Sequence, residues 1–467
     1  MLDGLEIKEI TLSDLYFENE EHRFDSEFVL KEYLEYDALI SRQKFFRIGE
    51  FSKVTDGIHS SIDFDENSNI NLISAKAPKK NTFNLEGTGY ISYTQNKLNP
   101  RTQLKENDII ISTVGTIGNC AVVDKTILPA NSDRHVGIIR VEKDSEYKPR
   151  FISTFLLSKY GRFQTKRHTT GNVQPNLFLY KIRDLKIPYI SLNFQQRIED
   201  IVVEATNLLQ KSKEIYEEAE ALLERELGFD SYIEPKEVYS VKNFSEVFGV
   251  SDRIDAEYYQ EKYDRLESIL HSYDPNCELL GNIVKYLFTG EYAEEYFNKD
   301  IDTRFFIRGT DIKNGYVEAD DNYCIYPNQY TKFVKTGDII TGRVGTIGNF
   351  GVIDNSLDNS LCSDNILCFH LPERYTPEVY ALYFNLPCVD EMITRLARGS
   401  VQQRLNQETL KMVEIPFIPE KKQLVMKAMV EESRSKQILA QELLNQAVHL
   451  VEIAIEQGEE EALKSLS

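Results

Sequence analysis

Hydrophobic positions in the first part of the chain come in short runs that Gly, Asn and Pro interrupt. The runs are rich in β-branched residues and lie at 70–73, 89–93, 108–113, 120–123 and 136–141. Short apolar runs bounded by turn-forming residues are typical of β-strands. A helical pattern follows at 150–158, and residues 377–385 show a similar pattern later in the chain. Each part is therefore predicted to be a mixed, β-rich domain of the α+β class.

After Pro188 the hydrophobic period changes to that of a long helix. Alternating spacings of three and four residues predict a continuous helix from 193 to 228, about 54 Å long. A second stripe repeats every seven residues, as in a coiled coil. The two stripes are Ile198, Ile201, Ala205, Leu208, Ser212, Ile215, Ala219 and Leu222, and Val202, Leu209, Tyr216 and Leu223.

A looser heptad pattern, interrupted by Glu432 and Lys436, predicts a second long helix in 421–463. A wide apolar helix face must be covered, and each of these helices is the available partner of the other. We expect the two to pair as an antiparallel coiled coil that separates two globular domains. The alternative is that each packs as a core helix on its own domain.

One twelve-residue segment occurs twice. Asp108–Asn119 returns as Asp338–Asn349 at an offset of 230 residues, and both copies contain Val-Gly-Thr-Ile-Gly-Asn. A period of this length indicates duplication of a whole domain. Two weaker echoes keep the same order: Arg23–Phe28 with Arg253–Tyr258, and Lys186–Pro188 with Glu414–Pro416. The predicted organisation is domain 1 at 1–192, a central spacer helix at 193–230, domain 2 at 231–418 and a C-terminal spacer helix at 419–467.

The 467-residue chain carries a net charge of −21, which argues against indiscriminate binding to a polyanion such as DNA. Much of the excess lies in two helical stretches, and one of them, 193–230, contains ten acidic and four basic residues. Local basic clusters are compatible with a nucleic-acid groove, and solvated surface cations are the alternative for any one of them. The clusters are Lys76, Lys79 and Lys80; Lys97, Arg101 and Lys105; Lys159, Arg162, Lys166 and Arg167; and Arg395, Arg398 and Arg404.

Cysteine and histidine spacing gives no sign of a metal or disulfide site. The six cysteines form no CxxC pair, and the seven histidines show no HxxxH or HExxH spacing. No run approaches the roughly 20 apolar residues of a membrane helix, and the N-terminal residues lack the pattern of a signal peptide. We therefore expect a cytoplasmic protein without a membrane span or a resident metal.

The two Val-Gly-Thr-Ile-Gly-Asn segments predict tight turns between strands. Glycine permits such a turn and leaves its backbone amides exposed. The default interpretation is a hairpin that defines the fold. In addition, Thr116, Asn119, Arg343 and Thr346 are predicted to contact a DNA backbone.

Polar loops before the last strand of each domain are candidates for reading DNA bases. Asn and Gln can bond bidentately to adenine, Arg to guanine, and Ser or Thr to either. The loops at 167–176 and 398–404 contain these residue types, and the loops at 74–80 and 308–314 differ between the copies. Divergent loops on a retained framework are what two different half-sites require. The predicted contacts are Lys76, Lys79, Lys80, Lys166, Arg167, Thr169, Thr170, Asn172 and Gln174 in the first copy, and Arg308, Lys313, Arg398, Ser400, Gln402, Gln403 and Arg404 in the second.

Several catalytic motifs are missing from the sequence. It contains no [DN]-P-P-[YF] motif for amino methylation, no glycine-rich S-adenosylmethionine loop, no GxxxxGK[ST] phosphate loop and no GxSxG elbow. We therefore expect a non-catalytic chain, and the missing motifs disfavour a single-chain restriction enzyme.

Taken in order, these residues resemble the specificity subunit of type I restriction–modification systems. The resemblance runs along the whole chain: the Arg-x-Asp-x-Glu-[Phe/Tyr] segments at Arg23 and Arg253, the glycine turns, the Gly-x-Val-Gln loops, the Ile-Pro strand ends and the Phe194–Ile198 helix start. It implies two target-recognition domains, each reading one half of a bipartite, asymmetric DNA site.

The resemblance also implies that the paired helices set the spacing between the domains and dock two methyltransferase subunits. Those partners bind S-adenosylmethionine and methylate adenine at N6, and restriction motor–nuclease subunits use ATP with Mg. A basic cleft in the methyltransferase would supply the positive charge that this acidic chain lacks. The alternative from another class is a non-catalytic coiled-coil scaffold that presents two domains to a non-nucleic-acid ligand.

Overall fold

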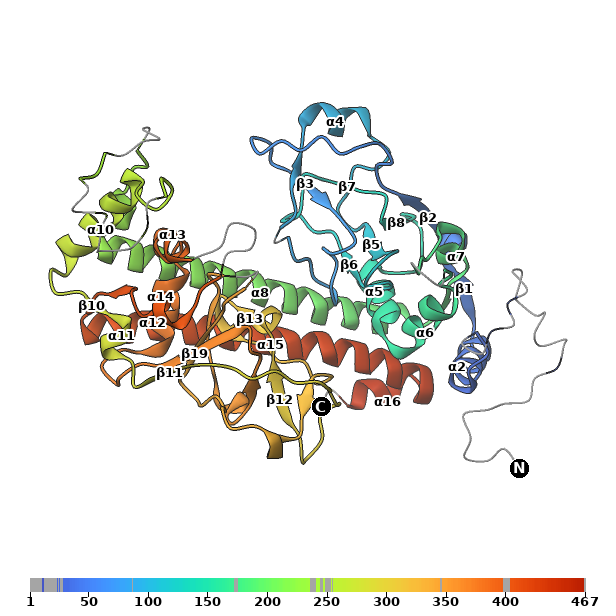
Figure 1. Ribbon diagram of the computed structural model, residues 1–467. Coiled ribbons are helices and arrows are strands. Elements are labelled where there is room, and N and C mark those ends of the chain that lie inside the picture. The colour runs from blue at the N-terminus through green and yellow to red at the C-terminus, as the bar shows by residue number, and fades with distance from the viewer. Residues whose placement is uncertain are drawn as a thin grey trace. The chain divides into compact units, whose positions relative to one another are not determined.

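The computed structural model describes residues 11, 23, 25, 28–85, 87–171, 175–235, 241–243, 247, 253, 255–344, 347–397 and 404–465. The chain forms two compact units. Unit 1 comprises Met1–Leu209 and Ile438–Ser467, and unit 2 comprises Gln210–Gln437. Figure 1 labels the elements of each unit.

Unit 1 contains an antiparallel four-stranded sheet in the order β2-β8-β5-β6 and a three-stranded sheet in the order β4-β3-β7. In Figure 1 the three-stranded sheet and α4 lie on the side of the four-stranded sheet that faces away from α5 and α8. The elements are α2 Lys31–Ser41, β1 Phe45–Arg47, α3 Ile48–Phe51, β2 Ser52–Asp56, β3 Ile70–Ile73, β4 Tyr90–Ile91, α4 Tyr93–Leu98, β5 Ile109–Ser112, β6 Cys120–Val122, β7 Ala130–Ser132, β8 Val136–Val141, α5 Pro149–Leu157, α6 Lys159–Arg167, α7 Leu179–Asp184 and β9 Lys186–Pro188.

The central strand β5 shows why this sheet forms. All of its residues are buried, and successive side chains of a strand point to opposite faces. Ile109 and Ile111 join the buried cluster that includes Phe155 of α5. Ile110 packs on the other face with Ile73 of β3. Burying each isoleucine contributes about 2–3 kcal/mol, so the isoleucine run favours a strand covered on both faces.

Unit 2 repeats this strand order. Its six-stranded sheet runs β11-β19-β16-β17-β14-β13, its three-stranded sheet runs β15-β12-β18, and β10 pairs with β20 as β1 pairs with β9. The elements are the 3₁₀ turn η1 Phe229–Ser231, α10 Glu261–Tyr273, β10 Glu278–Leu279, α11 Leu280–Ile283, β11 Tyr286–Thr289, β12 Arg304–Ile307, η2 Gly309–Asp311, β13 Ile312–Lys313, β14 Gly315–Val317, β15 Cys324–Ile325, η3 Pro327–Gln329, β16 Ile339–Gly342, β17 Phe350–Val352, η4 Asn355–Leu357, β18 Leu361–Cys362, β19 Ile366–His370, α12 Pro377–Asn385, α13 Pro387–Leu396, α14 Gln407–Leu410 and β20 Glu414–Ile415.

Two long helices, α8 (Leu192–Leu227) and α15 (Glu420–Gln457), each have a buried glutamine in the first turn. Gln195 Oε1 accepts from Lys148 N at 2.9 Å, and its Nε2 donates to Ile190 O at 2.8 Å. Gln423 makes the corresponding bonds with Thr376 N and Ile418 O at 2.8 and 2.7 Å. These amides tie the start of each long helix to the start of α5 or α12.

Within each unit, α8 and α15 contribute to a common core. In unit 1 both helices join the cluster that contains α5. In unit 2 the buried Ser212 hydroxyl donates to Ser433 O at 2.8 Å, and Lys422 pairs with Glu226. From Ser212 to Glu226 the residue number rises along α8, while from Ser433 to Lys422 it falls along α15. The apolar faces of α8 and α15 contact both the other helix and the core of the unit. Packing of a long helix on its own domain, which is the alternative from the sequence, therefore also occurs.

The helix predicted for 193–228 corresponds to α8, which ends at Leu227 before Gly228. Gly228 has φ 85°, the left-handed conformation that commonly terminates a helix. The helix predicted for 421–463 corresponds to α15 and α16 (Glu459–Lys464). The proposed four-segment division stays a prediction, since each compact unit takes part of both long helices.

The expectation that the chain has no membrane span stays a prediction. In the described part of the chain, α15 is the one helix whose length and composition would allow it to cross a membrane. A single such helix is weak evidence for a span, because core helices pass the same test. Leu444, Leu450 and Val451 of α15 are buried in the core of unit 1.

Candidate nucleic-acid interface

Four loops of unit 1 meet at the turn of the β5–β6 hairpin. We call them cluster 1: residues 74–83, 113–119, 133–135 and 169–177, of which 172–174 lie outside the described residues. Ser112 Oγ donates to Ala75 O at 2.7 Å. Thr113 N donates to His135 O at 3.1 Å, and Thr113 O accepts from Leu177 N at 2.9 Å. The end of one buried strand therefore holds the other three loops in place.

Unit 2 repeats the two backbone bonds of Thr113 in the corresponding loops, which we call cluster 2: residues 308–314, 343–349, 363–365 and 397–405. Of these, 345–346 and 398–403 lie outside the described residues. Arg343 N donates to Asn365 O at 2.9 Å, and Arg343 O accepts from Leu405 N at 3.0 Å. The backbone bonds match those of cluster 1, but the side chains differ: Arg343 stands where cluster 1 has Thr113, and Asn365 where it has His135.

A glycine beside each cluster leaves no room for a side chain. A Cβ on Gly57 would lie 2.1 Å from Asp133 O, and one on Gly290 would lie 2.1 Å from Cys362 O. These backbones approach closely because Ile58 N and Glu291 N donate to the carbonyls of Ser132 and Cys362. Sequence reasoning missed both positions, although Gly57 directly follows β2 and Gly290 directly follows β11.

The glycine turn of cluster 1 is held by an arginine from α6. Gly115 and Gly118 have φ of 67° and 80°, which favour glycine. Arg162 donates from Nη1 to Ile117 O at 3.2 Å and from Nη2 to Asn119 Oδ1 at 2.6 Å. Burial lowers the pKa of Arg162. Asn119 is thus engaged inside the turn, while Thr116 is exposed at its tip.

In unit 2 the position of Arg162 is taken by Asp390, at the same offset that relates Leu177 to Leu405. A Cβ on Gly348 would lie 2.0 Å from Asp390 Oδ1. This oxygen is buried and has no hydrogen-bond partner among the described residues. Burial and the neighbouring Glu391 raise the pKa of Asp390. The two glycine turns therefore rest on side chains of opposite charge type.

An arginine clamp closes the helix that precedes each polar loop. Arg23 Nη1 donates to Arg167 O and Thr169 O at 2.7 and 2.9 Å, at the C-terminal end of α6. Its guanidinium also pairs with Asp25. The Phe28 ring lies 5.1 Å from the Arg23 guanidinium and 4.4 Å from that of Arg167.

Unit 2 contains the same clamp. Arg253 Nη1 donates to Arg395 O and Ala397 O at 2.9 and 3.2 Å, and Arg253 pairs with Asp255. Tyr258 takes the place of Phe28 and lies 4.6 Å from Arg253 and 4.4 Å from Arg395. The repeated Arg-x-Asp segments thus fix the stems of the polar loops.

The predicted contact residues occupy different environments. Lys76, Lys80, Lys166 and Arg404 are exposed at the clusters, and Lys79 and Thr170 are partly exposed. Those outside the described residues are Asn172, Gln174, Thr346, Arg398, Ser400, Gln402 and Gln403. DNA contact by any of these residues stays a prediction.

Several predicted contacts bond to the protein itself. Arg167 Nε donates to Phe28 O, and the Thr169 hydroxyl donates to Thr165 O. Arg308 pairs with Asp311 and stacks on Tyr323 at 3.5 Å, and Lys313 Nζ donates to Thr310 O. Arg343 Nη1 donates to Asp364 O at 3.3 Å, while its buried Nε has no partner among the described residues. The arrangement gives Arg167 and Arg308 clear structural roles.

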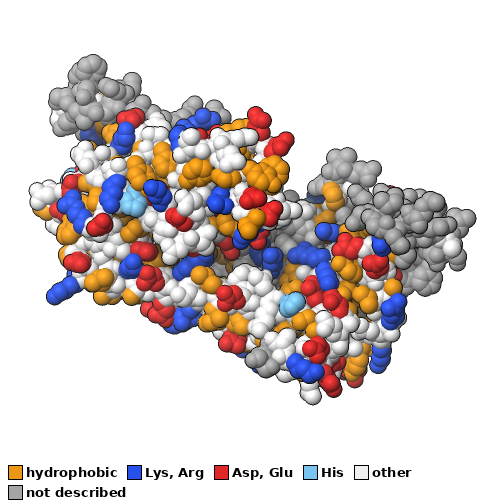
Figure 2. All heavy atoms as spheres, turned by 90° about the horizontal axis from the view of Figure 1, so that it is seen from below, with side chains coloured by type: hydrophobic (Ala, Val, Ile, Leu, Met, Phe, Trp, Pro, Cys, Tyr) orange, Lys and Arg blue, Asp and Glu red, His pale blue; other side chains and the backbone are white. Residues whose placement is uncertain are grey.

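Sequence reasoning missed several exposed side chains near the small sheets. Arg134 is exposed in the third loop of cluster 1. Phe64, Tyr93 and Tyr292 have exposed fractions of 62%, 59% and 68%. An exposed aromatic side chain cannot be told from a core one by its sequence, so no signal identified them. Figure 2 shows basic and acidic side chains interspersed on the face in view.

Within the described ranges, no group of three or more His, Cys, Asp and Glu side chains is placed to hold a metal ion.

The part of the chain that contains cluster 1 matches a known protein family. Residues 41–221 match the model of the type I restriction modification DNA specificity domain. Over these residues the chain is similar to a type I DNA specificity domain. The matched residues run from the end of α2 into α8, so the match includes all of cluster 1 and Gln195. Cluster 2 lies beyond them.

The similarity of the chain to solved structures is weak. The type I S subunit from M. genitalium is 11% identical over 90% of this chain and 95% of that chain, with a TM-score of 0.38. The HsdS subunit from Thermoanaerobacter tengcongensis is 13% identical over 89% and 97%, with a TM-score of 0.29. Scores this low support no argument about fold or function. No curated protein matches the sequence.

Proposed function

We propose that this chain is the DNA specificity subunit of a type I restriction–modification complex and that each unit reads one half of a bipartite, asymmetric site. The observation that carries the proposal is the pair of loop clusters. Their backbone bonds correspond, while their side chains differ. A duplicated framework with divergent loops suits two different half-sites, and cluster 1 lies in the residues that match the specificity-domain model.

Base reading is assigned to the polar loops that follow the arginine clamps. Phosphate contacts position a protein on DNA, whereas contacts to base edges supply specificity. The exposed Lys76, Lys80 and Lys166 suit phosphate. Base contacts are proposed for Thr169, Thr170, Asn172 and Gln174 in unit 1, and for Arg398, Ser400, Gln402, Gln403 and Arg404 in unit 2.

The long helices are proposed to act as a spacer. Opposite chain directions at the Ser212–Ser433 and Glu226–Lys422 contacts favour an antiparallel coiled coil. The glutamine anchors suit this role because they hold each helix start against its domain. Exposed faces of these helices would dock two methyltransferase subunits.

The catalytic chemistry is assigned to the partners, and the subunit itself is proposed to be non-enzymatic and cytoplasmic. Methyltransferase subunits would bind S-adenosylmethionine, and restriction motor–nuclease subunits would bind ATP with Mg. A basic cleft on the methyltransferase would offset the net charge of −21 of this chain.

Selection from random-sequence DNA duplexes tests the proposal. The purified chain is tested alone and with a type I methyltransferase subunit as the proposed partner. We expect enrichment of two defined sequence blocks at a fixed separation with the complex, and weak enrichment with the chain alone. A stable complex that enriches no sequence would favour the scaffold alternative.

A further inference from the structure

An exposed histidine lies beside cluster 1 in unit 1. Ile58 pairs with Asp133 of cluster 1 in a parallel bridge, and His59 is the next residue. The His59 side chain is 62% exposed. Its Nε2 contacts Asp56 Oδ2 at 2.5 Å, and Asp56 Oδ1 accepts from Arg101 at 3.0 Å. One carboxylate therefore holds the ring at the cluster, while most of the ring faces solvent.

Unit 2 has a tyrosine at the corresponding position. Glu291 pairs with Ser363 of cluster 2 in a parallel bridge, as Ile58 pairs with Asp133, and Tyr292 is the next residue. Tyr292 is 68% exposed, and its hydroxyl makes no hydrogen bond within the part of the chain that the structure describes. An exposed ring thus occurs at this position in both units, but the two rings carry different hydrogen-bonding atoms.

The backbone before each ring is closely packed. A Cβ on the glycine two residues earlier would lie 2.1 Å from a carbonyl oxygen in either unit. In unit 1, Arg101 also donates to Asp56 O and Gly57 O at 3.2 and 3.4 Å. In unit 2, the Glu291 carboxylate accepts from the two backbone amides at 331–332, each at 2.9 Å. Side chains on a backbone fixed in this way are suited to discriminate between bases.

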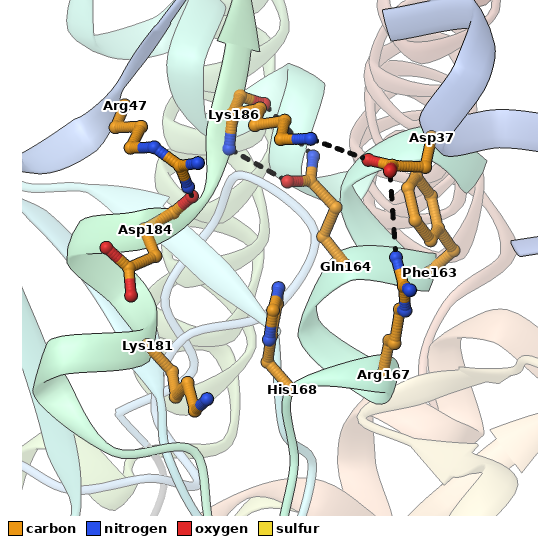
Figure 3. A pocket seen from close by; sticks show the side chains of 9 residues that line it. All are labelled: Asp37, Arg47, Phe163, Gln164, Arg167, His168, Lys181, Asp184 and Lys186. Atoms are coloured by element: carbon orange, nitrogen blue, oxygen red, sulfur yellow. Dashed lines mark hydrogen bonds and ion pairs between the residues drawn. The ribbon is translucent and has the colours of Figure 1, made fainter. Parts of the chain in front are cut away.

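The charged side chains beneath the first polar loop are used inside the protein. They line a cavity of about 240 Å³ in unit 1, and Figure 3 shows several of them joined to one another. Lys186 Nζ donates to Asp37 at 3.1 Å, and Lys186 N donates to Gln164 Oε1 at 2.8 Å. Arg47 donates to Asp184 O at 2.9 Å. These contacts support the stem of the loop and leave DNA contact to side chains at the surface.

We infer that His59 and Tyr292 are corresponding base-contact residues, one for each half-site, and that their difference helps the two clusters to prefer different bases. This inference rests on the proposed function. A tyrosine hydroxyl can donate or accept a hydrogen bond, and an apolar ring can pack against the methyl group of thymine. A neutral imidazole has one donor and one acceptor nitrogen, closer to the backbone than a tyrosine hydroxyl. Exchange of the two rings should therefore change the preferred base.

Repetition of the position distinguishes these rings from ordinary surface side chains. Single exposed apolar side chains are common on proteins and need no explanation. Here the bridge to a cluster loop and the glycine without room for a Cβ both recur, while the ring itself differs. A retained framework with a changed contact atom is what two different half-sites require.

Selection from random-sequence duplexes by the complex with a type I methyltransferase subunit tests the inference. Tyr292→Ala should lower the affinity for the duplex that the wild type selects about tenfold, as expected for loss of one base contact. Tyr292→His and His59→Tyr introduce the ring of the other unit, and each should change the selected bases in one block only.

Tyr326→Ala is the matched control. Tyr326 is 46% exposed and follows β15, which lies on the other side of β12 from β18. Its replacement should leave both blocks and the affinity unchanged. A loss equal to that of Tyr292→Ala would show that any exposed aromatic side chain of unit 2 has this effect, and would overturn the inference.

Salt titration separates a base contact from a phosphate contact. Each phosphate contact contributes about 0.9 to the slope of the logarithm of the association constant against the logarithm of salt concentration. Tyr292→Ala and His59→Tyr should leave this slope unchanged. A lower slope with unchanged base preference would assign the rings to phosphate and contradict their role in base reading.

The inference and the proposed function fail in different ways. If the wild type, Tyr292→His and His59→Tyr select the same two blocks and melt at the same temperature, the inference is overturned and the proposed function stands. If the wild-type complex selects no sequence, both are overturned.

Discussion

At the scale of single residues, the arginine clamps connect sequence to function most directly. Arg23 stacks on Phe28 and satisfies two carbonyls at the end of α6, which lie more than 140 residues from Arg23 along the chain. The sequence showed Arg-x-Asp twice. It could not show the role, because that role depends on the distant partner Arg167.

Replacing Arg23 with alanine removes charged hydrogen bonds to two backbone carbonyls. We expect a loss of about 2 kcal/mol in the free energy of unfolding of unit 1, since hydrogen bonds to charged groups contribute roughly 1.5–3 kcal/mol. Urea unfolding of the full-length chain, followed by circular dichroism, measures this loss. Arg42→Ala, at an exposed arginine nearby, should change stability little. Equal midpoints for the two variants would show that the clamp has no energetic role.

His168 makes a pH-dependent contribution to the free energy of unfolding, and the sign of this contribution follows from its lowered pKa. Its pKa is about 3 in the folded chain and about 6.5 when unfolded. Because the folded value is lower, the stability from this group is fully present above pH 6.5 and is lost as pH falls toward 3. Between pH 7 and pH 5, the free energy of unfolding of the wild type should fall by about 2 kcal/mol more than that of His168→Leu.

Urea unfolding in phosphate-free buffer at pH 7, 6 and 5 checks this difference. Parallel pH curves for the wild type and His168→Leu would mean that the ring titrates normally in the folded chain.

At the scale of elements, regular periodicity was informative and short elements were not. The isoleucine run of β5 and the heptads of α8 identify these elements from sequence alone. The strands β1, β9 and β10 contain only two or three residues, so no period can be read from them. Their pairing depends on contacts between residues far apart in the chain.

Gln195 provides the element-scale prediction. Gln195→Met keeps the side-chain volume but leaves Lys148 N, Glu146 O and Ile190 O without their partner. Each buried unsatisfied group costs about 1–3 kcal/mol, so we expect a total loss of about 3 kcal/mol. Gln196→Met is the matched control, because the Gln196 side chain is exposed and donates to Asp200 one turn further along α8.

Thermal melting of both variants measures the difference. If Gln195→Met melted at the same temperature as Gln196→Met, the Gln195 amide would not anchor α8 to its domain, and the spacer would need another attachment.

At the scale of the whole molecule, the internal repeat was the strongest sequence signal. It predicted two related β-rich domains, and the strand orders of the two units correspond. It did not predict the division of each long helix between two compact units, because that division depends on which residues pack together. The base-reading residues were chosen by type alone, and most of them lie outside the described residues.

The central claim is that one cluster reads one half of the site. The most direct test maps N6-methyladenine by single-molecule sequencing in a methylation-free host. The host expresses the proposed methyltransferase partner with either the wild-type chain or Arg404→Ala. The account predicts a split motif for the wild type and, for Arg404→Ala, a change confined to one half. A contiguous motif, or the same motif from both chains despite normal assembly, would contradict the reading role assigned to cluster 2.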